Sequence, residues 1–330
     1  MARRLRLTAA FYRLTWGPWS AAIGRVRDAK KRESYLGLYG PFSILLLLAI
    51  WAGMLILGFA LVSWGLSLPM RTPGGTARFA DYLYGSGETF FTLGYGDVVP
   101  ESGLGRALAV LAAGTGFGFL ASVIGYLPVL SQAFSRRELN ISMLDQRAGS
   151  PPTGAELLRR HADDPERRAL TALLHDWERW SAELLESHVS FPVLGFFRSQ
   201  HDNQSWLSAL AAILDACALV IVGVRGADAS QARLTFAMAR HAVVDMVRVY
   251  GKPPVPAGPD RLDPQELGAL RETLAAGRIP LAAGEEADSR LGALRAMYEP
   301  HLRALSHFLL MPLPPWVPTE KSRDHWQSLV

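Results

Sequence analysis

Residues 92–97, Thr-Leu-Gly-Tyr-Gly-Asp, are the part of this chain whose residue types and spacing could do chemistry. Glycine adopts positive φ angles at little cost, so Gly94 and Gly96 allow the backbone to turn where a side chain would be strained. A backbone of this kind can direct successive carbonyl oxygens toward one axis. Such oxygens can replace the hydration shell of a potassium ion. The stretch therefore predicts a site through which a dehydrated cation passes.

Two long apolar segments flank this stretch and would have to position it. Residues 42–68 and 104–134 carry very little charge, and each is longer than the roughly 20 residues that cross a bilayer core. They predict transmembrane helices. Between them, residues 69–77 form a turn region and residues 78–91 are too polar to span. We expect 78–91 to be a half-inserted pore helix, whose C-terminal end favours a cation because of the helix dipole.

The basic residues are distributed unevenly along the chain. Nine Lys and Arg residues precede Gly40, and Arg136 and Arg137 follow the second apolar segment. The positive-inside rule predicts a multi-pass protein of the cell membrane with both termini in the cytoplasm. A basic N-terminal cluster also suits an anionic lipid surface. Nucleic acid is the rival partner, but a membrane span directly behind the cluster argues against nucleic-acid binding.

The order of helix, re-entrant helix, TLGYGD and second helix resembles the two-transmembrane potassium channels of bacteria, over about residues 35–137. The resemblance implies a homotetramer in a lipid bilayer, with one filter strand from each chain. It also implies that potassium binds the backbone carbonyls of Thr92, Leu93, Gly94 and Tyr95 and the Thr92 hydroxyl. Tyr95 would then pack against the pore helix, and Asp97 would lie at the outer end of the filter. No cofactor is implied beyond the permeant ion.

The same resemblance suggests roles for residues near the filter. Glu88 falls where the family can carry an acid behind the filter. It could share a proton with Asp97, or it could make an ordinary hydrogen bond to the backbone. Gly116 matches the hinge glycine of the inner helix, and bending there could move the residues of the inner mouth. Those residues are Leu120, Ile124 and Pro128. Alternatively, Gly116 and its neighbouring glycines serve helix packing only.

Some residues depart from the common pattern of that family. Leu93 stands where valine is usual, and Phe90 and Phe91 are larger than the usual small residues. A non-selective cation channel is therefore an alternative to a potassium-selective one, and a membrane-anchored sensor or scaffold with a non-conducting pore is another. No helix carries Arg or Lys at every third position, so the sequence shows no voltage sensor.

The remainder of the chain is expected to be helical, which makes the fold all-α. We predict a basic interfacial segment over residues 1–40, with a helix interrupted near Gly17-Pro18 or a loosely held tail, and a pore domain over residues 41–138. A linker follows over residues 139–153, and a cytosolic α-helical regulatory domain over residues 154–330. Residues 206–224 are apolar enough for a third span, but a central Asp215 favours a buried helix. The start of another helix is indicated by Asp263-Pro264.

The regulatory domain resembles the helical C-terminal part of a poorly described group of bacterial two-helix channels, which implies no particular ligand. Binding of an unknown cytosolic ligand by this domain is one alternative. No glycine-rich turn that would bind a dinucleotide follows residue 145. Several polar side chains could hold a metal or sense protons, although solvated or core roles suit them better. They are His175, Asp176, Glu178, His188, His201, Asp202, His241 and Asp245. None fits a catalytic motif, so we expect no enzyme. The prolines around Trp316 predict an extended tail that packs on a neighbour or stays mobile.

Overall fold

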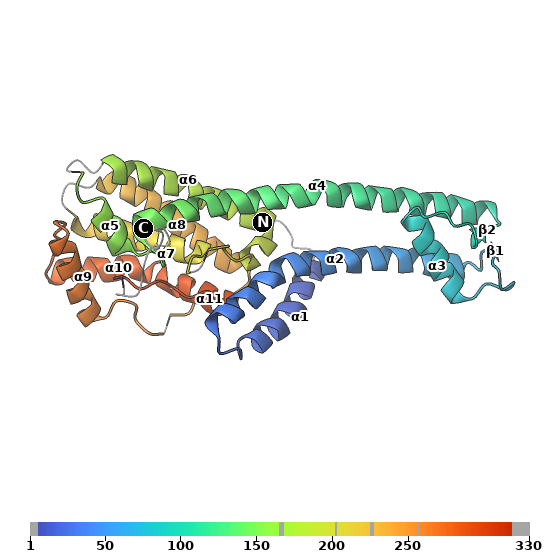
Figure 1. Ribbon diagram of the computed structural model, residues 1–330, viewed down its shortest axis with the longest axis horizontal. Coiled ribbons are helices and arrows are strands. Elements are labelled where there is room, and N and C mark those ends of the chain that lie inside the picture. Colours follow the sequence, from blue (N-terminus) through green and yellow to red (C-terminus); the bar gives the residue numbers. More distant parts are fainter. Residues whose placement is uncertain (1–5, 165–167, 202, 225–227, 257, 319–330) are drawn as a thin grey trace, which may run out of the picture. The chain divides into compact units, whose positions relative to one another are not determined.

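The computed structural model describes residues 6–164, 168–201, 203–224, 228–256 and 258–318. The chain divides into two compact units (Figure 1). Unit 1 comprises residues 1–19 and 41–132, and unit 2 comprises residues 20–40 and 133–330. Two long helices belong to both units, because each begins in one unit and ends in the other. The described elements are almost all helices, which confirms the predicted all-α class.

Unit 1 is built from α2 (Ala29–Gly65), α3 (Phe79–Phe90) and α4 (Gly103–Ala148), with α1 (Arg6–Ile23) contributing its first part. Two short strands, β1 (Met70–Arg71) and β2 (Val99–Pro100), pair antiparallel on either side of α3. This pairing brings the chain before α3 next to the chain after the filter. In unit 1, α3 and residues 91–98 therefore form a loop between the two long helices, and the pairing of β1 with β2 joins the two ends of this loop.

Helices α2 and α4 are long and apolar enough to cross a membrane, and only 17% and 11% of their most apolar windows are buried within the chain. Such a surface suits lipid or a partner subunit. A third helix, α7 (Trp206–Gly223), is equally apolar, but 89% of its window is buried. The prediction that this segment is a buried helix is therefore confirmed by the packing of unit 2.

Unit 2 is a helical bundle around α7. Its other helices are α5 (Gly154–Arg160), α6 (Arg168–Ser190), α8 (Ala229–Val249), α9 (Pro264–Ala276), α10 (Glu285–Ala296) and α11 (Glu299–Leu309). A short 3₁₀ helix, η1 (Pro192–Phe196), follows α6. The predicted start of α9 is confirmed, because the Asp263 side chain accepts hydrogen bonds from the amides of Gln265 and Glu266. The only cysteine of the sequence, Cys217, is fully buried in α7, and burial raises the pKa of its thiol.

Helix α1 continues through the position where the sequence predicted a break, and α2 begins earlier than the predicted span. The helix α1 runs through Gly17-Pro18 without interruption. Helix α2 begins at Ala29, inside the predicted interfacial segment, and continues through Pro41. A proline removes one backbone hydrogen bond, which packing elsewhere can offset. On the N-terminal side of Pro41, Leu36 and Tyr39 are buried in unit 2, and this packing holds the helix together.

The predicted linker over residues 139–153 is largely helical, because α4 continues to Ala148. Its composition suggested a linker, but the residues that break a helix lie only at its end, in Gly149-Ser150-Pro151-Pro152. Before them, Ile141, Leu144 and Ala148 are buried at helical spacing. Apolar packing on one face therefore extends α4 into unit 2.

The C-terminal tail packs on its own chain as far as the structure describes it. The Ser208 hydroxyl donates a hydrogen bond of 3.1 Å to the carbonyl of Pro312, and Trp316 is buried. The predicted contact with a neighbour, or mobility, is therefore wrong for residues 311–316. Residues 319–330 of the predicted regulatory domain lie outside the described residues.

Candidate ion-conduction site

Helix α3, the predicted pore helix, positions the start of residues 92–97, the predicted filter, through its last turn. Thr92 donates its amide to the carbonyl of Thr89 at 3.1 Å, and Leu93 donates to the carbonyl of Glu88 at 2.9 Å. At the other end of α3, the Tyr82 hydroxyl donates to the carbonyl of Leu68 at 2.8 Å. The helix is therefore fixed at both ends, and the filter leaves it at a defined angle.

The backbone of residues 92–96 has a positive φ angle at every second residue. Thr92, Gly94 and Gly96 have φ angles of 54°, 68° and 78°. Alternating left- and right-handed residues turn successive peptide planes so that neighbouring carbonyls can point to the same side, as a carbonyl ion site requires. Glycine tolerates this conformation freely, whereas for a β-branched threonine it is an outlier that the surrounding structure must hold. Sequence reasoning found the two glycines but had no signal for Thr92.

Glu88 contacts the predicted filter through a hydrogen bond. Its side chain is buried, and one carboxylate oxygen accepts a hydrogen bond of 3.0 Å from the amide of Gly96. Asp97 instead accepts a bond of 3.3 Å from the Tyr84 hydroxyl. The described hydrogen bonds of Glu88 and Asp97 thus go to different partners. The bond to Glu88 comes from the backbone, which is the second of the two alternatives for this residue. Sequence reasoning missed Tyr84, although its place one turn before Glu88 on α3 was a signal.

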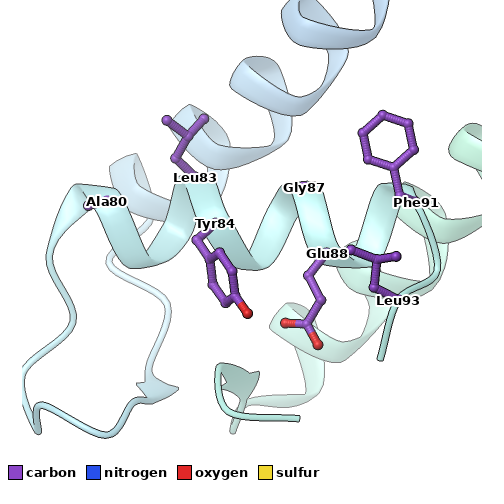
Figure 2. Close-up of a pocket in the computed structure, with 7 residues that line it drawn as sticks. All are labelled: Ala80, Leu83, Tyr84, Gly87, Glu88, Phe91 and Leu93. Atoms are coloured by element: carbon purple, nitrogen blue, oxygen red, sulfur yellow. The ribbon is translucent and has the colours of Figure 1, made fainter. Parts of the chain in front are cut away.

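A mainly apolar cavity of about 380 Å³ lies along α3 and the first filter residues (Figure 2). Tyr84 and Glu88 leave the same side of α3 there, with Leu93 beside them. Phe91 is 57% exposed, Leu93 53% and Tyr95 69%. The expected packing of Tyr95 against the pore helix is therefore not made within one chain.

The backbone of α4 at Gly116 lies close to Phe90, the last residue of α3. A Cβ atom at this position would lie 1.8 Å from the carbonyl oxygen of Phe90. The neighbouring Gly114 and Gly118 have no atom within 4 Å of such a Cβ. Gly116 therefore has a packing role in the single chain, and α4 is helical through it.

The residues expected at the inner mouth lie on one face of α4. Leu120, Ile124 and Pro128 follow one another at four-residue spacing, and all three are exposed in the single chain. Four residues are slightly more than one helical turn, so these side chains form a stripe. Pro128 does not interrupt the helix.

The polar residues considered as metal or proton sites are dispersed. The exposed His241 and the half-buried Asp245 form a pair at 3.5 Å, and Glu178 accepts a hydrogen bond of 2.8 Å from Gln231. Asp202 lies outside the described residues. Within the described part of the chain, no three His, Cys, Asp or Glu side chains gather as metal ligands would.

His188 is the fully buried member of that set. Its Nδ1 lies 2.7 Å from the carbonyl of Leu184, and its ring packs against Trp206 with centroids 5.3 Å apart. Burial, together with the positive charge of Arg137, lowers the pKa of His188 to about 3. The ring is therefore neutral in the folded protein.

This burial predicts a loss of stability in acid. The unfolded chain takes up a proton at His188 below pH 6.5, whereas the folded chain does not until about pH 3, so stability falls as the pH drops through that range. We expect a cost of about 2 kcal/mol at pH 5 relative to pH 7.5. His188→Phe keeps a ring against Trp206 and should reduce this loss in thermal unfolding of the full chain. Equal losses in both proteins would contradict the prediction.

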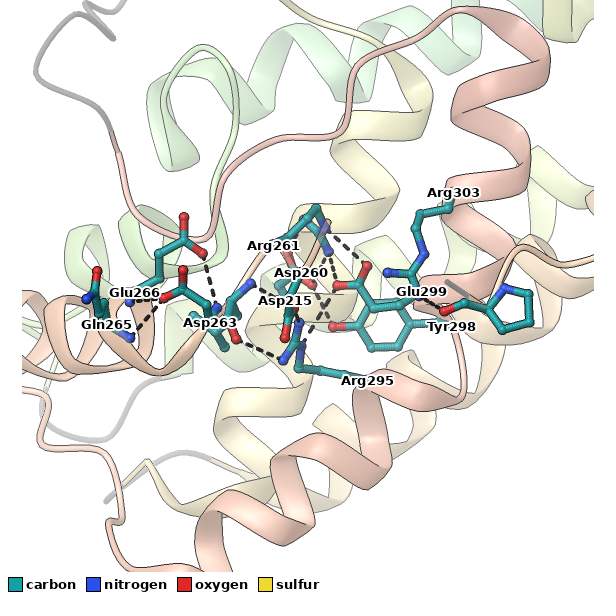
Figure 3. Close-up of polar contacts among 12 residues, drawn as sticks. Asp215, Asp260, Arg261, Asp263, Gln265, Glu266, Arg295, Tyr298, Glu299 and Arg303 are labelled. Carbon is teal, nitrogen blue, oxygen red and sulfur yellow. Dashed lines mark hydrogen bonds and ion pairs between the residues drawn. The ribbon is translucent and has the colours of Figure 1, made fainter. Parts of the chain in front are cut away.

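A buried charged network surrounds the middle of α7 in unit 2 (Figure 3). The Arg261 guanidinium donates to both carboxylate oxygens of Asp215, at 3.1 Å and 3.0 Å, and to both of Glu299, at 3.2 Å and 2.7 Å. The Tyr298 hydroxyl donates to Asp215 at 2.6 Å. Arg261 also donates to the carbonyl of Pro314 at 2.8 Å, which fixes the tail.

The charges of this network are strongly coupled. Burial raises the pKa of Asp215 to about 6, with Arg261 opposing the shift and Glu299 adding to it. Burial alone would lower the pKa of Arg261, but its two carboxylate partners raise it above its ordinary value. One guanidinium with a single positive charge thus bonds to two buried carboxylates, and the Arg295 guanidinium lies 3.9 Å from Glu299.

Comparison with known proteins bears on unit 1. Residues 44–130, from α2 through the filter into α4, match the protein family described as "Ion channel". This segment belongs to the ion channel family. The chain is a membrane protein, with α2 and α4 as its spanning helices. Residues 44–130 are here called the ion channel domain.

A curated relative is the uncharacterized membrane protein YdjJ of Bacillus subtilis (strain 168). It is 27% identical over 192 residues, which are 57% of this chain and 55% of the relative. The chain thus spans about half the length of the relative that it matches. No solved structure matches the chain. The family match covers residues 44–130 alone and does not extend to the helical bundle of unit 2.

Proposed function

We propose that four copies of this chain form a potassium-selective channel in the cell membrane. The observation that carries the proposal is the alternation of positive φ angles at Thr92, Gly94 and Gly96 in the ion channel domain. Potassium would bind the backbone carbonyls of residues 92–95 and the Thr92 hydroxyl, which take the place of water. Glu88 would hold the filter at its diameter through the amide of Gly96.

The exposed apolar surface of the filter region supports a tetramer. The cavity along α3 and the exposed rings of Phe91 and Tyr95 have no cover within one chain. Exposed apolar surface of this kind indicates an interaction site. A second copy of the ion channel domain, seated against α3, would cover both and would give Tyr95 the packing that it lacks.

Charge and helix continuity support the orientation and the gate. Basic residues precede α2 and follow the apolar part of α4, which favours cytoplasmic termini and a cytosolic unit 2. The gate would be the stripe of Leu120, Ile124 and Pro128, moved by bending or tilting of α4. An unidentified cytosolic ligand that binds unit 2 more tightly in one arrangement would shift this equilibrium.

Flux measurements test the proposal. The purified chain in liposomes should carry potassium much faster than sodium, and Gly94→Ala should reduce potassium flux by about tenfold or more, because alanine at a positive φ costs about 1–2 kcal/mol in each subunit. Gly53→Ala is the matched control, since a Cβ there meets nothing within 4 Å. Equal potassium and sodium flux would favour a non-selective cation channel. A tetramer that carries neither ion would favour a sensor or scaffold.

A further inference from the structure

Residues 191–198 of unit 2, here called the bridging segment, contact both helices that continue from the ion channel domain. The segment consists of η1 and the residues on either side of it. Within unit 2 it meets residues 29–40 of α2 and residues 133–148 of α4. It also meets the ends of α8 and α11.

Arg137 joins α4 to the bridging segment. Its side chain is buried, and its guanidinium donates to the carbonyl of Leu194 at 2.8 Å and to the carbonyl of Phe197 at 2.9 Å. Glu138 balances the charge at 2.9 Å. Two bonds from one rigid fork fix both distance and angle, so α4 cannot rotate or slide here without breaking them.

The contacts with α2 are equally close. The Phe197 ring lies 2.7 Å from the position that a Cβ on Gly40 would take, so the backbone of α2 approaches the ring directly. Tyr39 packs edge-on against Phe196, with centroids 5.2 Å apart. Arg198 forms an ion pair of 3.3 Å with Glu33.

The other side of the bridging segment is fixed to the bundle. The Tyr250 hydroxyl, just after α8, donates to the carbonyl of Pro192 at 3.0 Å. Arg198 donates to the carbonyls of Leu309 and Leu310, which caps the C-terminus of α11. One guanidinium therefore contacts α2 and the end of the bundle at the same time.

We propose that the bridging segment is the coupling element between unit 2 and the pore, with Arg137 and Arg198 as the residues that transmit movement. This coupling proposal rests on the proposed function of the protein as a gated channel. When a rearrangement of α8 or α11 displaces the segment, the cytosolic ends of α2 and α4 change their spacing. Because α2 and α4 continue as helices into the ion channel domain, this change reaches the gate.

Single-channel recording of the full chain tests this coupling. Arg137→Gln and Arg198→Gln should each change the ratio of open to closed time about 2- to 30-fold, the range typical for residues that couple distant sites. Arg137→Lys keeps the charge but loses the fork and should show a smaller change. Tyr250→Phe removes the hydroxyl that donates to Pro192 and keeps the ring, so it is the milder change to the same segment. Arg136→Gln is the matched control, because Arg136 is the exposed neighbour on α4.

Hydrogen–deuterium exchange on the same proteins separates the possible failures. Arg137→Gln and Tyr250→Phe should speed amide exchange in residues 191–198, and Arg136→Gln should not. Faster exchange with an unchanged open-to-closed ratio would overturn the coupling and leave the channel function intact. A wild-type protein that carries no ion while its bridging segment exchanges as expected would instead overturn the proposed function, and the coupling to conduction with it.

Discussion

Replacing Arg261 with methionine is expected to destabilise unit 2 by about 3–5 kcal/mol, because removal of one partner leaves buried charge without compensation. Asp215 is fully buried and Glu299 nearly so, and Arg261 is the group that bonds to all four of their carboxylate oxygens. Methionine keeps an unbranched apolar stem, but it is shorter than arginine and carries no charge. The expected loss is among the largest that a single substitution causes.

Amide exchange in α7 of the full-length protein measures this effect directly. A loss of about 3–5 kcal/mol corresponds to exchange that is roughly 150- to 5,000-fold faster where global opening dominates. Arg290→Met is the control, because Arg290 is exposed on α10. Adding Asp215→Asn and Glu299→Gln to Arg261→Met should restore much of the stability, since the uncompensated charges are then gone. Unchanged exchange in Arg261→Met would show that the network does not stabilise the bundle.

Gly116→Ala is expected to lower the thermal stability of the assembled channel and to abolish conduction. The added Cβ would meet backbone atoms of Phe90, with the carbonyl oxygen at 1.8 Å, so α3 and α4 must separate. Overpacking of this kind costs about 1–3 kcal/mol per site, and a tetramer would contain four such sites. The filter begins two residues after Phe90, so the displacement would reach it.

The sign of the stability change separates packing from a hinge. A glycine that serves only for bending gains about 0.5–1 kcal/mol of helix stability when it becomes alanine. Gly116→Ala should therefore melt at a lower temperature than the wild type if Gly116 serves to pack against Phe90. It should melt at a higher temperature if Gly116 serves only for bending. Gly118→Ala, with open space around its Cβ within the chain, should show the higher temperature.

The backbone conformation at Gly94 and Gly96 was predictable because it depends on residue type at fixed spacing. Gly94 and Gly96 have the positive φ angles that the sequence suggested, and Glu88 lies behind them. Thr92 was not predictable, since a threonine with φ of 54° is imposed by bonds at the end of α3 rather than by its own preference. Tyr95 is 69% exposed in the single chain, so its expected packing against α3 is not made there.

The limits of the long helices were harder to predict for a different reason. Proline and glycine indicate helix ends locally, but α2 continues through Pro41 and α4 continues to Ala148. Buried contacts of the helix ends in unit 2, such as Ile141 and Leu144, outweigh the local preference. The sequence shows the periodicity of these residues but not the surface that covers them.

In unit 2, the sequence indicated helices but could not indicate their polar partners. Asp215 was recognisable as a charge within an apolar helix. Its partners, Arg261 and Tyr298, lie 46 and 83 residues further along the chain. Only the folded bundle brings them together. The same holds for Arg137, whose carbonyl partners belong to η1 and the residue after it.

The single thiol of this chain lies in the middle of α7, two residues after Asp215, with no surface open to water. A thiol reagent cannot reach it until α7 separates from its neighbours, and burial also suppresses its ionisation. The rate at which a thiol reagent labels Cys217 therefore reports how often the bundle opens in the unmodified protein. Because Cys217 does not react in the folded protein, a cysteine introduced at the surface can be labelled selectively with a probe.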